Sequence, residues 1–165
     1  GGRNMEQLSM FPTPYRYIID ASAILSQKPN ELHRRTVHKS QWEKIDELIR
    51  NHEIVMCSEI YDEVKDEEIK KLLTSLSCKV IKIDDDIQKY VKKIVTECPK
   101  LISFTERSGT SSGDAFLIAT AMKYNLVIIT EENKQKANKI PQVCQKFNLE
   151  CINILELCER EHWVF

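Results

Sequence analysis

Five short apolar runs along the chain predict buried β-strands. Each run is rich in β-branched or aromatic residues and is bounded by polar or charged positions, as is typical of strands. The run from Leu126 is the clearest, since four successive positions are apolar. The predicted strands are Tyr15 to Ile19, Glu53 to Cys57, Cys78 to Ile83, Leu126 to Thr130 and Glu150 to Asn153.

Helical spacing of apolar residues fills much of the sequence between these runs. The segment Asp84 to Cys98 is amphipathic, with apolar residues three or four positions apart. The helix that begins at Asp114 is apolar at nearly every position, so it must be covered on more than one side. Further helices are expected at Ala21 to Ser26, at Ser40 to Asn51, in two pieces between Ser58 and Leu76, at Ile140 to Phe147, and from Ile154 onward.

Apolar strands that alternate with helices indicate a mainly parallel sheet with helices on both faces. A chain of 165 residues has the length of one domain, and no repeat or linker divides it. The sequence therefore predicts a single α/β domain over residues 15–165, built on a central five-stranded sheet. Residues 1–14 are expected to form a tail, in which Gly1 to Asn4 look like a remnant of cloning.

The composition excludes several classes of protein. Only Gly109 and Gly113 lie away from the N-terminus, so the chain has no glycine-rich loop of the kind that cradles a nucleotide. The 25 acidic and 24 basic residues nearly balance, so contact with nucleic acid would need a local basic patch. No run approaches the ~18 apolar residues of a membrane span. The six cysteines form no close pairs of the kind that bind zinc, which favours a reduced, cytoplasmic protein.

Acidic residues recur where predicted strands end and the following helices begin. Taken singly, the aspartates among them are ordinary helix caps and the glutamates are solvated surface charges. Together they would share one edge of a parallel sheet, where like charges repel unless a cation lies between them. Carboxylates without a nearby His or Cys favour Mg²⁺ or Mn²⁺, ions that activate water and neutralise a phosphodiester. The four acids are Asp20, Glu63, Asp114 and Glu132.

Four segments, in order along the chain, resemble the PIN domain family. They are Tyr17 to Ser22, Ser58 to Val64, Gly113 to Ala121 and Val127 to Glu132. The resemblance covers about residues 15 to 155 and implies a PIN-like three-layer domain with metal-dependent nuclease activity. Such domains are commonly VapC-like endoribonuclease toxins that an antitoxin holds in check. The family's three core acids would correspond to Asp20, Glu63 and Asp114.

The resemblance also assigns the residues around these acids. Glu132 takes the fourth acidic position, where the family usually has Asp, and its extra methylene changes how a second metal would be held. The neighbouring Glu131 could be taken for the fourth acid in place of Glu132. By the resemblance, Asp20, Glu63, Asp114 and Glu132 would be both the catalytic residues and the metal ligands. Ser22 and Thr130 would be polar supports of this site.

A basic segment offers a surface for RNA. Residues 28–44 hold five basic and two acidic side chains, a net charge of +3 without the histidines. Phosphate contacts need such local positive charge, since the acidic site itself repels RNA. We expect Arg34, Arg35 and Lys39 to contact RNA, with a solvated loop as the alternative, and Trp42 to belong to the core. Besides RNA, the expected partners are an antitoxin protein and a second copy of the chain in a homodimer. No contact with a membrane is expected.

Two other functions compete with the nuclease. The residues 109–113 match the Gly-x-Ser-x-Gly pattern of a serine hydrolase, with Ser111 as nucleophile. That pattern requires a strand running directly into the turn and a later His, and only His162 follows. The stronger rival is a PIN-like module that binds RNA or protein without cleaving it, an alternative that Glu132 keeps open.

Overall fold

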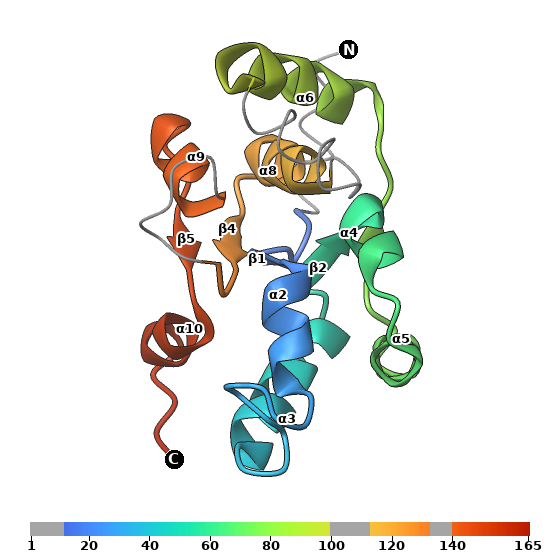
Figure 1. Ribbon diagram of the computed structural model, residues 1–165, viewed down its shortest axis with the longest axis vertical. Coiled ribbons are helices and arrows are strands. Elements are labelled where there is room, and N and C mark those ends of the chain that lie inside the picture. The colour runs from blue at the N-terminus through green and yellow to red at the C-terminus, as the bar shows by residue number, and fades with distance from the viewer. Residues whose placement is uncertain (1–11, 100–112, 133–139) are drawn as a thin grey trace.

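The computed structural model describes residues 12–99, 113–132 and 140–165 and shows an α/β fold (Figure 1). Its five strands form one sheet in which every neighbouring pair is parallel, in the order β3-β2-β1-β4-β5. The predicted five-stranded parallel sheet is thereby confirmed. The strands are β1 (Tyr17–Ile19), β2 (Ile54–Cys57), β3 (Val80–Ile81), β4 (Val127–Ile129) and β5 (Cys151–Ile152).

The helices lie where the apolar spacing predicts them, with ends that differ by a few residues. They are α2 (Ala21–Ile24) continued by a 3₁₀ turn (Leu25–Gln27), α3 (Lys39–Arg50), α4 (Ser58–Glu63), α5 (Glu67–Ser75), α6 (Asp85–Glu97), α8 (Gly113–Tyr124), α9 (Ile140–Lys146) and α10 (Ile154–Arg160). Within the described part of the chain, no helix has both the length and the apolar character needed to cross a bilayer.

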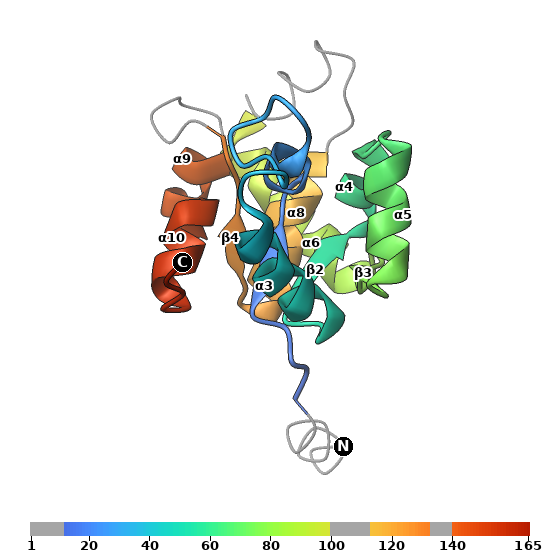
Figure 2. The same ribbon diagram turned by 90° about the horizontal axis from the view of Figure 1, so that it is seen from below.

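Helices on both faces of the sheet make the fold three-layered. The helix α8 packs against β1, β2 and β4, and α6 packs on the outside of α8 (Figure 1). On the other face lie α2, α3 and α10. In Figure 2 the chain enters β1 from the bottom of the view, so the carboxyl ends of the parallel strands face the top. This upper edge is where ligands bind in folds of this kind.

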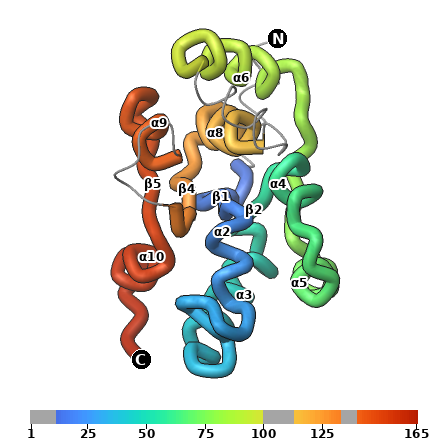
Figure 3. The backbone as a smooth tube through the Cα atoms, viewed as in Figure 1, coloured from blue at the N-terminus to red at the C-terminus, as the bar shows by residue number. Residues whose placement is uncertain are grey.

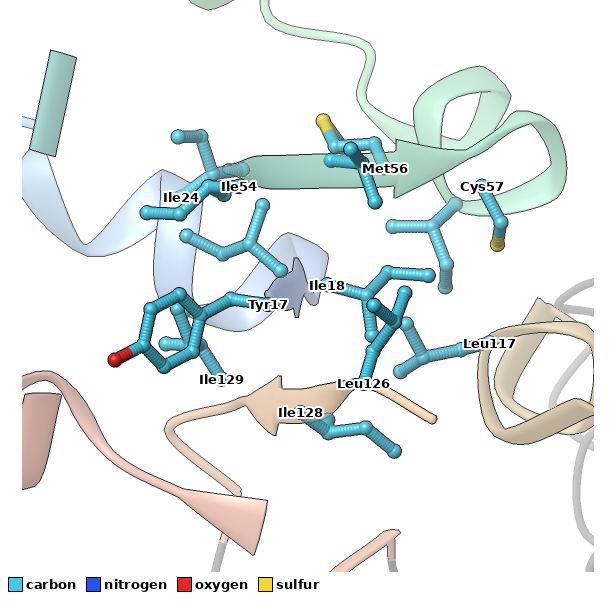
Figure 4. Packing of buried hydrophobic residues seen from close by; sticks show 14 of the residues in the cluster. Tyr17, Ile18, Ile24, Ile54, Met56, Cys57, Leu117, Leu126, Ile128 and Ile129 are labelled. Carbon is cyan, nitrogen blue, oxygen red and sulfur yellow. The ribbon is translucent and has the colours of Figure 1, made fainter. Parts of the chain in front are cut away.

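Burial on several sides explains the unusual composition of α8. Its buried positions include Ala115, Leu117 and Ala119, and even Thr120 is fully buried. Figure 4 shows Leu117 of α8 pointing toward Ile18 and Leu126 in the interior. Trp42 of α3 is also fully buried, which confirms the core assignment made from its spacing.

The chain crosses the centre of the sheet once. From β1 it proceeds outward through β2 to β3, and it then returns through α6 and α8 to β4 and β5 on the other side (Figure 3). The order of strands therefore reverses between β1 and β4. Such a switch point opens a crevice at the carboxyl ends of the two strands, because the connections that follow them diverge.

A polar cluster fastens the end of α10 to the start of β1. The hydroxyl of Tyr17 donates to Oε2 of Glu161 at 2.5 Å, and Arg16 donates to the same oxygen at 2.5 Å. Burial alone would raise the pKa of Glu161, but the hydrogen bonds from Tyr17 and Arg16 outweigh it and hold this pKa below its ordinary value. The ionised carboxylate therefore stabilises the fold.

We expect Glu161→Gln to lower the free energy of unfolding at pH 7 by about 1 kcal/mol, the net worth of a typical hydrogen bond. A lowered pKa means that the stabilisation is present above the ordinary Glu pKa of 4.5 and is lost as the pH falls through the folded value. Urea titrations at pH 7 and pH 3.5 measure the difference between the two chains, which should shrink at the lower pH. The exposed Glu159→Gln is the control on the same helix, and a difference that grows with acidification would contradict the assignment.

Candidate functional site

Asp20 and Thr130 lie on the two sides of the switch point. Asp20 follows β1 directly, and Thr130 follows β4. The backbone N–H of Asp20 donates to the carbonyl oxygen of Ile129 at 2.8 Å, which fixes the two strand ends against each other. In Figure 2 the end of β4, the helix α2 and the start of α8 all lie toward the top of the view.

The carboxylate of Asp20 is buried and held by two hydroxyl groups. Only 4% of the residue is exposed. Ser22 donates its hydroxyl proton to Oδ2 at 2.6 Å, and Thr130 donates to the same oxygen at 2.9 Å. Although Asp20 stands at the N-cap position of α2, its side chain makes no capping hydrogen bond. The interpretation of Asp20 as an ordinary helix cap is therefore wrong, because its acceptor oxygen is turned to the hydroxyls instead.

Backbone groups orient both hydroxyls. The N–H of Glu131 donates to Oγ of Ser22 at 3.1 Å, and the N–H of Glu132 donates to Oγ1 of Thr130 at 3.2 Å. Each hydroxyl thus accepts from the backbone and has one proton to give to the carboxylate. The result is a directed arrangement in which Oδ2 of Asp20 is fully engaged. Among the described residues, no group donates a hydrogen bond to its other oxygen, Oδ1.

The carboxylate of Glu63 lies against Gly113, the residue before Asp114. Glu63 is the last residue of α4, Asp114 lies in the first turn of α8, and the two helices pack against each other. A Cβ atom added at Gly113 would lie 2.5 Å from Oε1 of Glu63 and 2.8 Å from its Cδ. The absence of a side chain at Gly113 therefore leaves the space that the Glu63 carboxylate occupies.

The two neighbouring glutamates after β4 have different surroundings. Oε2 of Glu132 accepts a hydrogen bond at 3.0 Å from the backbone N–H of Ile140, the first residue of α9. Glu131 uses both oxygens, one toward His33 and one toward the first residue of α10. The sequence did not reveal this role of Glu131, because no local pattern indicates which distant segments meet a loop residue. Whether Glu132 binds a metal stays a prediction.

The donor types at this edge suit a hard divalent cation. Asp20 presents Oδ1, and Glu63 and Asp114 are further carboxylates, on α4 and at the start of α8. In residues 12–99, 113–132 and 140–165, however, no three His, Cys, Asp or Glu side chains stand close enough together to hold an ion. Mg²⁺ commonly takes only one or two protein carboxylates and keeps several waters, so the donor set fits it. Cys57 is not a candidate metal ligand, because burial raises the pKa of its thiol to about 12, with a smaller contribution from the charge of Asp20.

Part of the basic segment, residues 28–44, forms contacts within the fold. Arg35 donates two hydrogen bonds of 2.8 Å to the carboxylate of Asp46 and one of 2.9 Å to Gln27. These contacts give Arg35 a structural role in holding residues 28–38 to α3. Arg34 and Lys39 form no ion pair with the described residues, and whether they contact RNA stays a prediction. The expected nucleophile Ser111 lies outside the described residues.

Comparison with known proteins places the fold. No curated protein matches the chain. The structure of PAE2754 from Pyrobaculum aerophilum is similar with a TM-score of 0.52 and 16% identity, over 90% of this chain and 90% of that one. The structure of VapBC2 from Rickettsia felis, bound to a DNA fragment from their promoter, is similar with a TM-score of 0.51 and 20% identity, over 83% of this chain and 97% of that one. At such identities the likeness shows the fold alone.

The fold is PIN-like, as the resemblance of the four segments implies. The family match extends over nearly all of the described fold, from β1 to the C-terminal residue. Residues 17–165 match the family described as a domain of unknown function, DUF4411, and the chain belongs to this family.

Proposed function

We propose that the chain is a metal-dependent endoribonuclease that hydrolyses phosphodiester bonds of RNA. In this proposal residues 15–165 form the nuclease domain, and Asp20, Glu63, Asp114 and Glu132 hold Mg²⁺ or Mn²⁺. The observation that supports it most is the state of Asp20. A carboxylate buried at the switch point, with one oxygen held by two hydroxyls and the other without a donor in the described part of the chain, is suited to binding a cation.

The roles of the residues follow from their contacts. When bound, Mg²⁺ or Mn²⁺ supplies a water of lowered pKa and neutralises charge on the phosphate. Ser22 and Thr130 hold the Asp20 carboxylate in one orientation, so that Oδ1 stays directed away from the hydroxyls. Gly113 leaves room for Glu63 next to Asp114. Arg34 and Lys39 would bind RNA phosphates beside the site and offset the repulsion between RNA and its acids.

The partners of the proposed nuclease are an RNA substrate and a protein that restrains it. One of the structurally similar proteins is VapBC2, bound to a DNA fragment from their promoter. By analogy we propose that the chain is the VapC-like toxin of a toxin–antitoxin pair, acting in the cytoplasm, and that it forms a homodimer. Size-exclusion chromatography with light scattering tests the homodimer, which a mass of 19.3 kDa in solution would exclude.

Cleavage assays with the purified chain test the nuclease directly. A mixture of single-stranded and structured RNAs is incubated with Mn²⁺, with Mg²⁺ or with a chelator. Endonucleolytic fragments are expected with either metal and none with the chelator. Cleavage by the Asp20→Asn chain at the wild-type rate would identify the activity as a contaminant and end the proposal.

The second candidate is a PIN-like module that binds RNA or protein without cleaving it. Two observations favour it: Glu132 holds the start of α9 through Oε2, and the described residues contain no three-ligand metal cluster. This module would retain RNA in a filter-binding assay and leave it intact with every metal. Intact RNA together with tight binding would therefore select this candidate over the nuclease.

A further inference from the structure

We propose that Glu131 is a positioning residue of the candidate site, an inference that rests on the proposed function. Its side chain ties residues 28–38 and the start of α10 to the end of β4. Its backbone N–H then holds Ser22, and through Ser22 the carboxylate of Asp20. Glu131 thus differs in role from Glu132, although the two residues are adjacent and identical in type.

Both carboxylate oxygens of Glu131 are engaged by groups from distant segments. Oε1 lies 3.1 Å from Nε2 of His33, and Oε2 accepts from the backbone N–H of Ile154 at 2.8 Å. Because an ionised carboxylate can only accept, Nε2 of His33 carries the proton of this hydrogen bond. The side chains of His33 and Glu131 are only 14% and 17% exposed. A carboxylate so occupied is poorly placed to be a metal ligand.

The two groups that Glu131 binds are themselves fixed to the core. The carbonyl oxygen of His33 accepts from Nε1 of the fully buried Trp42 at 2.6 Å, and its N–H donates to Ser26 at 3.1 Å. Ile154 is fully buried and follows Asn153, whose side chain caps α10. Glu131 therefore joins two rigid supports.

This attachment bears on the site through the backbone. With its side chain held at both oxygens, the Glu131 peptide has little freedom to turn, and its N–H points steadily at Oγ of Ser22. Ser22 in turn makes the shortest hydrogen bond to Asp20, at 2.6 Å. Loosening the side chain of Glu131 would release the N–H, allow the Ser22 hydroxyl to rotate, and leave the Asp20 carboxylate less well oriented.

The test compares Mn²⁺ binding by the wild type and by Glu131→Ala, measured from the electron paramagnetic resonance signal of free Mn²⁺ without RNA. Loss of a group that orients a metal ligand typically weakens metal binding 10- to 100-fold. Glu131 acts on Asp20 through Ser22, one residue further from the metal, so Glu131→Ala is expected to raise the dissociation constant for Mn²⁺ about tenfold. Glu150→Ala is the matched control, because it removes an exposed carboxylate that pairs with Arg160 at the far end of α10, and its Mn²⁺ affinity should equal that of the wild type.

A double-mutant comparison separates positioning from a general loss of structure. If Glu131 acts through Ser22, the chain with both Glu131→Ala and Ser22→Ala should bind Mn²⁺ as weakly as Ser22→Ala alone. Fully additive losses would overturn the inference. Should Glu131→Ala fold poorly, Glu131→Gln keeps an acceptor for Ile154 and is expected to raise the dissociation constant by a smaller factor, about threefold.

The remaining outcomes distinguish this inference from the proposed function. A wild type that binds Mn²⁺ and cleaves RNA, while Glu131→Ala and Glu131→Gln bind Mn²⁺ equally well, would overturn the positioning role alone. A fall in melting temperature without a change in Mn²⁺ affinity would do the same, because it would show a purely structural role. A wild type that neither binds Mn²⁺ nor cleaves RNA would overturn the proposed function and the inference with it.

Discussion

Replacing Asp20 by Asn is expected to reduce RNA cleavage by about a thousandfold at saturating Mn²⁺. The amide oxygen of Asn can accept the hydrogen bonds of Ser22 and Thr130 in place of Oδ2. The amide nitrogen then replaces Oδ1, which removes the negative charge and the acceptor that no described residue engages. A metal ion contributes several kcal/mol to the transition state, and 1.36 kcal/mol corresponds to a factor of ten in rate. Single-turnover rates measured over a range of Mn²⁺ concentrations give the effect.

Stability measurements and a neighbouring variant control for misfolding. Because the hydroxyl contacts are retained, the Asp20→Asn chain should melt within a few degrees of the wild type. Asp62→Asn removes an exposed carboxylate next to Glu63 and should cleave at the wild-type rate. If Asp20→Asn cleaved normally, the cleavage would come from a contaminant and the proposed nuclease would be excluded. If Asp62→Asn were equally inactive, the loss would reflect net charge rather than a specific ligand.

The sequence alone was sufficient to predict the scaffold of this site. The apolar run at β4 and the apolar α8 can only be accommodated in the interior of a layered fold, so periodicity identifies both. The predicted strand Cys78 to Ile83 is shortened to Val80–Ile81, which lies at the edge of the sheet and, among the described strands, pairs with β2 alone. Strand ends thus depend on neighbours that local patterns do not specify.

The contacts within the site could be predicted only in part. That Asp20 comes directly after a strand is evident from the order of residues, whereas the place of Thr130 beside it followed from the family resemblance. That Asp20 binds hydroxyls rather than capping α2 depends on the rotation of one side chain. The role of Glu131 depends on His33 and Ile154, which are 98 and 23 residues away. No local rule distinguishes Glu131 from Glu132.

The glycine before Asp114 allows a second test, in which activity and stability should separate. Gly113→Ala is expected to lower the cleavage rate about 100-fold, because the new Cβ would lie 2.5 Å from Oε1 of Glu63 and force that carboxylate away. A displacement of about 1 Å at a reacting site can cost that much. The Glu63 side chain is flexible, so turning it aside costs little folding energy. The melting temperature should therefore stay within a few degrees of the wild-type value, while single-turnover cleavage falls.

Shortening Glu63 tests whether the effect is steric. In the Glu63→Asp background the carboxylate ends one methylene earlier, so an added Cβ at Gly113 meets less of it. Gly113→Ala should then cost clearly less than 100-fold, although Glu63→Asp is itself less active than the wild type. Equal losses in both backgrounds would mean that Gly113 acts through the backbone of α8 rather than through Glu63. Unchanged activity of Gly113→Ala would remove Glu63 from the site, since its carboxylate cannot keep its position beside an alanine.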